Sequence, residues 1–494
     1  MPHRVLIAGA GPVGLTMAAE LARYGVAVRI VDSAATRSDK SKALVLWSRS
    51  LELIDRMGCG ESFVAAGLKA TAANIIAGGK RVAHIQLDSV PTPHPYGLML
   101  PQSETERLME AQLNALGVQV ERQVTLAGFA QADDTVTAVL RHADGREESV
   151  AAGWLIGCDG AHSAVRHGLG MQFEGNTLPS NWVLADVHLA GVPWPLHELA
   201  IHLHAAGVLA LFPIAAAPGG GRYRVIADVG GLDMARRDPP LEEVQALLDQ
   251  RGPGGMVASA PIWLAGFVIN ERKVAKYRDG RVFLAGDAAH IHSPAGGQGM
   301  NTGMQDAINL AWKLALVCRG EAAEEPLLDS YSTERSEIGR QVLANAGRLT
   351  QMAMLKGALL QGLRNHMAAL LFGLPPVRRA MNNVLAELSI GYPDGPLTAV
   401  GAHLRGGPAA GARVPPTGQP IGAGRAPRFA LFGAACEQSD ALIRQFPALL
   451  EGEIRAPFTQ GGIWLARPDG YVALAAAQGD WQRVAAYLAR IAPV

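Results

Sequence analysis

Apolar and polar positions near the N-terminus follow two different periods. His3–Ala8 is an almost continuous apolar run, which predicts a buried β-strand. Gly11–Tyr24 carries apolar side chains at helical spacing, and Gly25 ends this helix in the way that glycine commonly does. Val26–Asp32 predicts a second strand. A strand, a helix and a strand in this order predict a βαβ unit with parallel strands.

Helical spacing and buried runs recur further along the chain. Helices are predicted at about Ser48–Met57, Glu104–Leu116 and Gln298–Arg319, and residues Ser332–Leu388 are strongly helical in pattern. Strands are predicted at Val118–Leu126, Thr135–Arg141, Trp154–Ile156 and Val282–Ala285, with a hairpin turn at Asp144-Gly145. The alternation of strands and helices favours an α/β fold.

Between residues 181 and 229 the pattern changes to short runs, several of them with near-alternating polarity. Strands are predicted at Trp182–Leu189, Leu199–His204, Val208–Ile214 and Arg222–Val229, and no long helix is expected before Glu242–Asp249. Consecutive strands without intervening helices indicate an antiparallel sheet, here inserted into the nucleotide-binding domain.

The last hundred residues form a separate region. Gly406-Gly407-Pro408 and Pro415-Pro416 indicate a linker, followed by predicted strands at Phe429–Phe432 and Gly462–Ala466 and a closing helix at Trp481–Ile491. The fold class is therefore α/β with three domains. A Rossmann-like βαβ domain with a helical extension is expected over 1–175 and 270–395, an antiparallel-sheet substrate domain over 176–269, and a small α/β domain over 396–494.

Composition narrows the class of protein. The chain has 44 Lys and Arg against 44 Asp and Glu, so nothing favours nucleic acid as a partner. None of its four cysteines lies in a CxxC pair or at metal-ligand spacing, which indicates reduced thiols in a cytoplasm and no metal site. The most apolar late stretch, Met367–Pro375, is too short to span a bilayer, so no membrane anchor is expected.

The first glycine motif follows the first predicted strand directly. Gly9, Gly11 and Gly14, with Pro12 and Val13 between them, open a helix whose N-terminal N–H groups and partial positive charge suit a diphosphate. Asp32 ends the second strand, where a carboxylate can accept hydrogen bonds from a ribose. This pattern fits either NAD or FAD.

A second glycine-rich segment favours FAD. Gly286-Asp287 follows the strand Val282–Ala285, and Asp287 can bind a ribityl chain. The loop that follows is predicted to wrap the isoalloxazine through Pro294, Gly297, Gly299, Met300 and Asn301. The helix beginning near Gln298 directs its positive end at the flavin edge that becomes negative on reduction. The chain contains no second GxGxxG motif that would indicate a separate nicotinamide domain.

A third segment, Gly157-Cys158-Asp159-Gly160, follows the strand Trp154–Ile156. Asp159 is either a ligand of the same cofactor or simply a turn residue. The three segments in this order resemble the FAD-dependent (class A) aromatic monooxygenases of the p-hydroxybenzoate hydroxylase type. The resemblance adds Lys42, Gln102 and Leu126 to the expected FAD contacts, and it indicates that Asp159 lies near flavin and nicotinamide.

The chain is most similar to the subgroup that acts on phenols and aromatic polyketides. The segment from Ala466 to Val472 resembles that subgroup's thioredoxin-like C-terminal domain, here without CxxC. The resemblance implies a tightly but non-covalently bound FAD, transient NADPH or NADH, O₂, and hydroxylation of a small aromatic or polycyclic substrate through a flavin C4a-hydroperoxide. It also implies a monomer or homodimer. A Baeyer–Villiger or other ring-oxidising monooxygenase, and a non-catalytic protein similar to GDP-dissociation inhibitors, are the alternatives.

The substrate pocket is expected between the antiparallel sheet and the flavin. Its predicted lining is Trp182, Val208, Ala210, Phe212 and Pro213. No general base is identified by the sequence. His202, His204 and Pro294 are the catalytic candidates, and His290 and His292 are expected beside the flavin loop.

Overall fold

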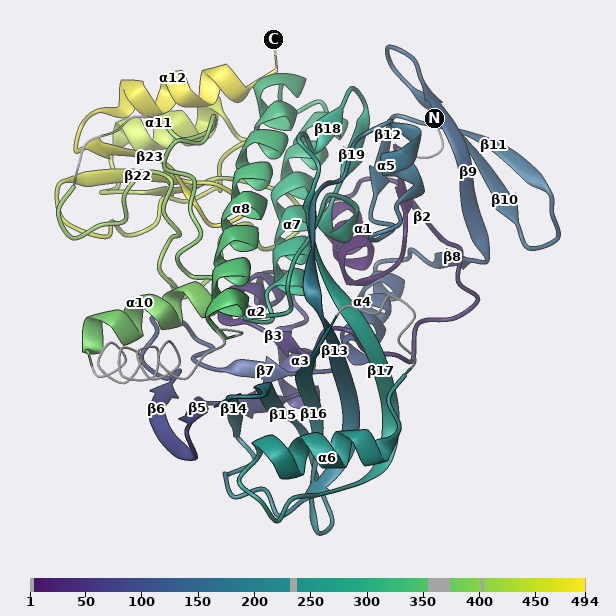
Figure 1. Cartoon of the computed structure of the whole chain (residues 1–494). Coiled ribbons are helices and arrows are strands. Elements are labelled where there is room, and N and C mark those ends of the chain that lie inside the picture. Colours follow the sequence, from purple (N-terminus) through teal and green to yellow (C-terminus); the bar gives the residue numbers. More distant parts are fainter. Residues whose placement is uncertain (1–3, 232–237, 354–373, 400, 402–403, 494) are drawn as a thin grey trace.

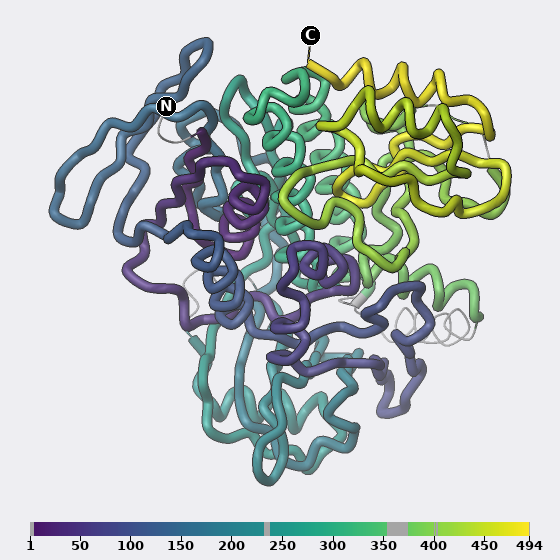
Figure 2. Tube along the Cα trace, turned by 180° about the vertical axis from the view of Figure 1, so that it is seen from behind, coloured from purple at the N-terminus to yellow at the C-terminus, as the bar shows by residue number. Residues whose placement is uncertain are grey.

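The computed structural model describes residues 4–231, 238–353, 374–399, 401 and 404–493. Figure 1 shows three parts: an α/β region around helices α1, α7 and α8, a large sheet below it that carries helix α6, and a C-terminal unit beside α8. Seen from behind, in Figure 2, the C-terminal unit packs along the green helices of the α/β region. The α/β fold class with a Rossmann-like parallel region and antiparallel sheets is confirmed.

The predicted βαβ unit lies at the centre of a six-stranded sheet of order β18-β19-β12-β1-β2-β8. The strands are β1 (Val5–Ala8), β2 (Val28–Asp32), β8 (Val120–Arg122), β12 (Trp154–Gly157), β18 (Arg278–Asp279) and β19 (Val282–Leu284), and all pairs are parallel except β18–β19. Helix α1 (Pro12–Arg23) connects β1 to β2 and packs against α4 (Gln102–Ala115) and α7 (Gly299–Cys318). The parallel neighbours β19, β12 and β1 therefore bring the ends of three distant segments to one edge of the sheet.

The strand predicted at Val118–Leu126 is divided in two. Gln123 has a φ of 57°, in the left-handed region, so β8 ends there and β9 (Val124–Gln131) starts in a new direction. β9 pairs with β10 (Val136–His142), which forms the predicted hairpin with β11 (Glu147–Ala152). Gly145 supplies the positive φ of 84° that this hairpin turn needs.

The predicted antiparallel sheet is part of a larger one, in which all strand pairs are antiparallel except the parallel pair β14–β5. Its order is β20-β17-β13-β16-β15-β14-β5-β6. The strands are β5 (Ala72–Ala77), β6 (Lys80–Gln86), β13 (Glu174–Ala190), β14 (Glu198–His204), β15 (Gly207–Ala217), β16 (Gly220–Gly230), β17 (Val257–Lys273) and β20 (His290–Ile291). The sequence does not signal β17 clearly, because Pro261 and Gly266 interrupt its apolar pattern. The domain bounds themselves stay a prediction.

This sheet has two differently covered faces. Helix α6 (Leu241–Arg251) packs on one face, where Val183, Leu209 and Leu247 belong to one buried cluster. On the other face, Phe212 packs in a second apolar cluster with Val45 and Trp47. That second cluster includes the small sheet of β3 (Val45–Leu46), β7 (Gly97–Met99) and β4 (Leu68–Ala70). The second face is therefore the one that looks toward the α/β region.

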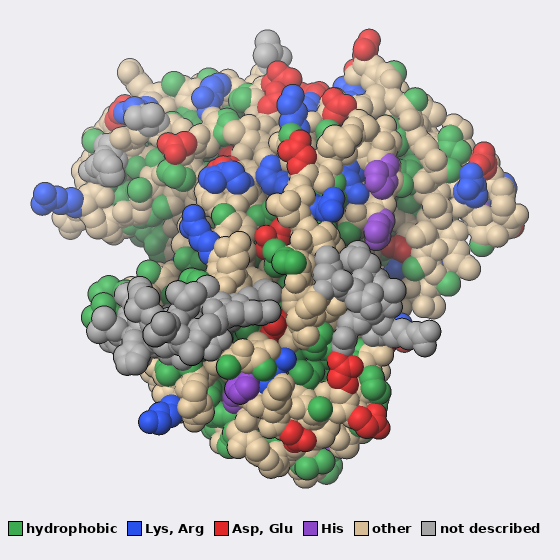
Figure 3. Space-filling view, viewed as in Figure 1, with side chains coloured by type: hydrophobic (Ala, Val, Ile, Leu, Met, Phe, Trp, Pro, Cys, Tyr) green, Lys and Arg blue, Asp and Glu red, His purple; other side chains and the backbone are tan. Residues whose placement is uncertain are grey.

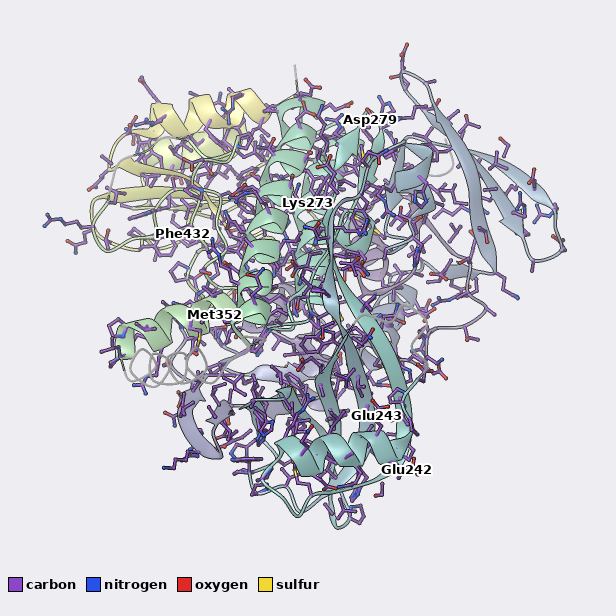
Figure 4. The ribbon with its side chains drawn as sticks, in the orientation of Figure 1. Glu242, Glu243, Lys273, Asp279, Met352 and Phe432 are labelled. Carbon is purple, nitrogen blue, oxygen red and sulfur yellow. The ribbon has the colours of Figure 1, made fainter. Side chains whose placement is uncertain are left out.

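The remaining helices connect these layers. They are α2 (Ser48–Arg56), α3 (Gly60–Ala66), α5 (Ala164–Gly168), the short 3₁₀ helix η1 (Gly286–Ala288), α8 (Glu324–Ala353) and α10 (Pro375–Leu385). Lys273 at the end of β17 lies beside α8 and donates to the Ser336 hydroxyl over 2.6 Å (Figure 4). The predicted helical segment Ser332–Leu388 is confirmed at both ends. Residues 354–373, with most of the apolar stretch Met367–Pro375, lie outside the described residues.

The C-terminal unit is a small α/β layer. Its strands β21 (Ala430–Phe432), β22 (Gly462–Ala466) and β23 (Val472–Ala477) form an antiparallel sheet, which α11 (Glu437–Gln445) and α12 (Trp481–Ile491) accompany. Figure 4 shows Phe432 within this unit. Basic and acidic side chains are interspersed over the face in Figure 3, in keeping with the balanced composition. Among the described helices, none combines the length and apolarity required to cross a membrane.

Candidate active site

The turn between β1 and α1 is held by glycines that serve two different purposes. Gly9 has a φ of 99°, and a Cβ there would overlap the Cys158 carbonyl; a Cβ at Gly14 would overlap the Gly9 carbonyl. These two glycines are therefore required by close backbone packing. Gly11 is different, since a Cβ there would meet no atom within 4 Å. Open space lies outside Gly11, where the sequence predicts a diphosphate.

The N-terminus of α1 carries no side-chain cap. Gly11 is the N-cap and Pro12 is the first helical residue, so the free N–H groups of this first turn face outward without a protein acceptor from the cap. Asp32 accepts from the Ala10 N–H over 2.7 Å and from the Ala34 N–H over 2.8 Å. It thus shapes the turn, and its two oxygens keep further lone pairs for an outside donor such as a ribose hydroxyl.

A buried carboxylate anchors the Gly286–Asp287 turn from behind. Asp306 of α7 accepts from the Gly286 N–H over 3.0 Å, from His290 Nε2 over 2.8 Å and from Arg335 Nε over 2.6 Å. Burial opposes ionisation of Asp306, but Arg335 and His290 more than offset it and lower its pKa. Sequence reasoning missed Asp306 and Arg335, because both lie in ordinary helical patterns.

Asp287 is the exposed residue of the Gly286–Asp287 turn. Its side chain is solvent-exposed, yet desolvation by the surrounding protein raises its pKa, against the charges of His290 and Lys42. The exposed carboxylate is therefore accessible to a ligand. Lys42, whose own side chain is exposed, is thereby placed near this carboxylate.

The loop before α7 is fixed by contacts with the segment around β3. Gly296 and Gly297 have positive φ values of 87° and 64°. Asn301 accepts from the Trp47 N–H over 2.8 Å and donates to the carbonyls of Val45 (2.9 Å) and Gly297 (3.0 Å). The Trp47 indole donates to the Gly296 carbonyl over 2.8 Å. Asn301 thus connects the loop to the β3 segment through three hydrogen bonds.

Three predicted residues of this loop remain open to the outside. Pro294 is exposed, and Gly299 and Met300 are half-buried at the start of α7. The N-cap of α7, Gln298, makes no side-chain capping hydrogen bond. The N–H groups of its first turn are therefore available to an anionic or carbonyl edge of a ligand.

Asp159 lies where the middle segment meets the other two. Its Oδ2 accepts from the Val165 N–H over 3.2 Å, while its Oδ1 is buried without a hydrogen-bond partner among the described residues. Arg166 of α5 donates to the Ala288 carbonyl over 3.1 Å, and Cys158 packs on Gly9. Val13 in turn lies against Gly286. The three glycine-rich segments therefore converge on one site.

Two residues expected from the resemblance lie on the edges of this site, and one lies in the core. Gln102 accepts from the Ala43 N–H over 3.1 Å and donates to Glu106 over 2.9 Å, at the start of α4. The Lys42 carbonyl accepts from Arg224 over 2.9 Å, which ties its segment to β16. Leu126 is a buried core residue of β9, 7% exposed, so it offers mainly its backbone.

The histidine candidates separate into two groups. His202 is paired with Leu209 on the α6 face, and its ring meets Trp194 edge-on at 5.2 Å. Burial and the neighbouring His204 lower the His202 pKa to about 4, and the His204 Nδ1 accepts from the Ala206 N–H. The structure does not bring His202 or His204 to the glycine segments.

His290 and His292 lie at and just after β20, directly before the Pro294–Asn301 loop. His292 Nδ1 contacts the Ser293 carbonyl over 2.8 Å and must donate to it, which leaves Nε2 as an acceptor. That Nε2 is buried without a partner among the described residues, and it lies 3.6 Å from the position of a Cβ on Gly299. Burial and His290 lower the His292 pKa to about 4, so this imidazole is neutral near pH 7.

The expected substrate-lining residues divide between the two sheet faces. Phe212 lies on the face toward the loop, and Ala210 pairs with Ile201 of the same apolar cluster. Trp182 alternates with Val183 of the α6 face, so it too faces the loop side, and its indole nitrogen is buried without a partner among the described residues. Pro213, which pairs with Tyr223, faces α6. Val208 shares the alternation of Ala210.

Other hollows and clusters do not coincide with this site. A recess of about 530 Å³ lies in the C-terminal unit, lined by Ala434, Cys436, Gln478 and Trp481 among others, and shares no residue with the glycine segments. Across the part of the chain that the structure describes, no group of three or more His, Cys, Asp or Glu side chains could hold a metal ion.

The residues of the convergent site suit FAD. The space at Gly11 and the uncapped α1 suit a diphosphate, and the exposed Asp287 suits a polyol. The uncapped α7 with its glycine loop suits the pyrimidine edge of an isoalloxazine. The unpartnered Asp159 Oδ1 and His292 Nε2 are acceptors that protein groups leave unused. Together these features define the class of an FAD-binding flavoprotein.

Comparison with known proteins gives the family. Residues 3–346 match the FAD binding domain family, so the chain belongs to that family of flavoprotein monooxygenases. It is 39% identical over 415 residues to 6-methylpretetramide 4-monooxygenase of Streptomyces rimosus, covering 81% of this chain and 73% of the relative. It is 33% identical to pentachlorophenol 4-monooxygenase of Sphingobium chlorophenolicum, covering 87% and 77%.

A solved structure supports the same conclusion. The anhydrotetracycline hydroxylase OxyS of Streptomyces rimosus superposes with a TM-score of 0.80 at 31% identity, over 100% of both chains. The resemblance to FAD-dependent aromatic monooxygenases is confirmed, and so is the use of FAD with NAD(P)H and O₂. The non-catalytic alternative is not supported, because the relatives that the chain matches are named monooxygenases. The individual cofactor contacts stay a prediction.

Proposed function

We propose that this FAD-dependent monooxygenase hydroxylates a phenolic or polycyclic polyketide-like aromatic in the chamber between the eight-stranded sheet and the flavin loop. The observation that carries the proposal is the placement of Phe212, Val45 and Trp47 in one apolar cluster directly beside the Gly296–Gly297 loop. The relatives that act on tetracycline intermediates and pentachlorophenol support an aromatic substrate for this chain as well.

The chain's own residues would divide the work as follows. Gly9, Gly11 and Gly14 with α1 bind the diphosphate, Asp32 the ribose and Asp287 the ribityl hydroxyls. The Pro294–Asn301 loop and α7 orient the isoalloxazine, with Lys42, Gln102 and Asp159 at its borders. Bound FAD supplies the hydride acceptance and oxygen activation that no side chain can perform.

Apolar side chains exclude water from the reacting ring and so limit wasteful release of peroxide. His292, neutral and with Nε2 as an acceptor, can accept a hydrogen bond beside the loop. His202 and His204 are left out of the chemistry, since they lie on the α6 face. Pro294 stays a candidate contact of the flavin loop rather than a proton donor, because proline has no side-chain donor.

The cofactor site is tested by Asp287→Ala. We expect flavin absorbance near ~450 nm to be lost from the purified variant, while the wild type keeps it. Asp279→Ala is the matched control, because Asp279 is an exposed carboxylate in the nearby strand β18. Full flavin content in Asp287→Ala would show that the ribityl contact lies elsewhere.

The reaction is tested by a substrate screen. Phenols and polycyclic aromatics are compared with cyclic ketones for stimulation of NAD(P)H oxidation, with oxygen consumed and peroxide released measured together. Hydroxylated product from a phenol supports the proposal. Ester or lactone product from a ketone would instead establish the Baeyer–Villiger alternative, whose cofactor requirements are the same.

We further propose a cytoplasmic monomer or homodimer. Cys59, Cys158 and Cys318 are buried free thiols and Cys436 is a half-buried one, which suits a reducing compartment. Light scattering of the purified protein distinguishes the two oligomeric states, and any larger species would contradict the proposal.

A further inference from the structure

Two neighbouring residues of α8, Glu334 and Arg335, have opposite charges and contact different parts of the molecule. Glu334 contacts the C-terminal unit, and Arg335 contacts the residues behind the Gly286–Asp287 turn. Both side chains are fully buried. Because they are adjacent on one rigid helix, a displacement of one displaces the other.

The Glu334 side joins three elements. Its carboxylate accepts hydrogen bonds from Arg467 Nη1 over 2.6 Å and Nη2 over 2.9 Å. It also accepts one from Lys313 Nζ of α7 over 2.9 Å. Arg467 also contacts Asp469 over 2.6 and 3.0 Å. Burial opposes the charge on Glu334, yet Arg467 and Lys313 lower its pKa to about 2. The β22–β23 turn is therefore held to α7 and α8 by a buried cluster around the ionised Glu334 carboxylate.

The Arg335 side reaches the candidate active site. Arg335 donates to Asp306 over 2.6 Å and to the Thr302 carbonyl over 3.0 Å, both on α7. Asp306 in turn accepts the Gly286 N–H. The third group bound by Arg335 is the Tyr392 hydroxyl, at 3.0 Å.

Tyr392 closes the connection between the two sides. The Arg467 guanidinium lies over its ring at 4.9 Å from the centroid, and the ring of Tyr471, the residue before β23, meets it edge-on at 4.7 Å. Arg467 therefore touches both Glu334 and the tyrosine that Arg335 binds. The contacts run without interruption from Arg467 through Tyr392 and Arg335 to Asp306 and the Gly286 N–H.

The charges of this chain of contacts are balanced. Lys313, Arg335 and Arg467 oppose Asp306, Glu334 and Asp469, and every one of these side chains is at most 2% exposed. Buried ions with such close partners hold defined geometry, because any displacement leaves a charge uncompensated.

We propose that the C-terminal unit positions the Gly286–Asp287 turn through Arg467, Tyr392, Arg335 and Asp306, and thereby sets the affinity and the reduction potential of the bound flavin. The inference rests on the proposed assignment of this turn to FAD. Arg467 and Tyr392 are positioning residues, since neither touches the site itself. The unit would then act in cofactor retention rather than in redox exchange.

The test compares conservative variants by titrating apoprotein with FAD and measuring the flavin potential. Tyr392→Phe removes only the hydroxyl that Arg335 binds, and Arg467→Lys keeps a charge but loses the two-pronged contact. We expect about 3- to 30-fold weaker FAD binding in each variant, together with a shifted potential. In the double variant the losses should not add, because both residues act on one chain of contacts.

Arg413→Lys is the matched control. Arg413 also ties the C-terminal region to the α/β region, through Glu52 at 2.8 Å, but contacts neither α7 nor α8. Its FAD affinity should stay within twofold of wild type. Additive losses, unchanged affinity in Tyr392→Phe and Arg467→Lys, or equal losses in Arg413→Lys would each overturn the inference. Wild-type apoprotein that binds no FAD would instead refute the proposed function.

Discussion

The interface beneath the C-terminal unit and the cleft at the glycine segments both bury polar groups, but they satisfy them differently. At the interface Glu334, Lys313 and Arg467 find all their partners in the protein. At the cleft Asp159 Oδ1 and His292 Nε2 lack partners among the described residues, and the first turn of α1 has no cap. The Glu334 cluster is therefore satisfied within the protein, although Arg49 Nε and Arg56 Nε elsewhere in the interface are buried without a partner among the described residues. At the glycine segments we infer that a ligand supplies the missing partners.

The contrast predicts that interface changes reduce stability and cleft changes reduce cofactor binding. Glu334→Gln should have the largest effect, because it leaves Lys313 and Arg467 buried with one anion fewer between them. We expect a loss of about 3–5 kcal/mol in the free energy of unfolding, measured by urea denaturation. The control is Glu337→Gln on the same helix, whose partner Arg340 is exposed and whose stability should be unchanged. Equal stabilities for the two variants would show that the interface does not depend on this ion cluster.

At the cleft, Gly11→Val should separate binding from folding. Its Cβ enters open space, so the free energy of unfolding of the apoprotein should change by less than about 1 kcal/mol. FAD affinity should fall more than about 100-fold, because the side chain occupies the place of the diphosphate. Gly14→Ala is the contrasting variant, since its Cβ meets the Gly9 carbonyl and should lower stability. A Gly11→Val protein with normal flavin affinity would remove this turn from the site.

The buried Glu387 carboxyl, which contacts α7, makes the stability of the protein depend on pH. It accepts from Thr302 over 3.2 Å and contacts Gln305, and burial raises its pKa to about 8. The folded state therefore holds a proton that the unfolded state releases above about pH 4.3, so stability falls as pH rises from about 4.3 to 8. Glu387→Gln should remove that fall, on the order of a few kcal/mol, in urea melts at several pH values. A decline of the same size in the variant would assign it to another group.

The smallest expected effect concerns the flavin loop. Trp47→Phe removes the indole donor to the Gly296 carbonyl but keeps the aromatic packing. One lost hydrogen bond should weaken FAD binding about 3- to 10-fold without a comparable loss of stability. Trp481→Phe in the C-terminal unit serves as the comparison, because its indole lies outside the cleft. If both variants bind FAD like the wild type, the loop does not need this brace.

Much of the fold follows from local patterns, and the failures have physical causes. The βαβ unit, the hairpin at Gly145 and α7 were predictable because glycine punctuation and apolar period agree. The two-part strand at Gln123 and the long β17 were not, since a left-handed non-glycine residue and an interrupted pattern give no local signal.

The site shows the same division. Glycines 9, 11 and 286 could be found because backbone approach leaves a sequence pattern, whereas Asp306 and Arg335 act through tertiary contacts that no spacing reveals. His202 was a candidate from chemistry alone. Its alternation along β14 gave no indication of which sheet face α6 covers.

The packing around Val13 has a practical consequence for altering this monooxygenase. A Cβ on either Gly286 or Gly303 would overlap the Val13 side chain. Helix α1, η1 and α7 are therefore packed closely around this one residue. Ala210 and Phe212, in contrast, belong to a sheet that shares no such backbone contact with this point. Libraries aimed at new substrates can therefore vary Ala210 and Phe212 among apolar side chains of similar volume, while leaving Val13 and its two glycines unchanged.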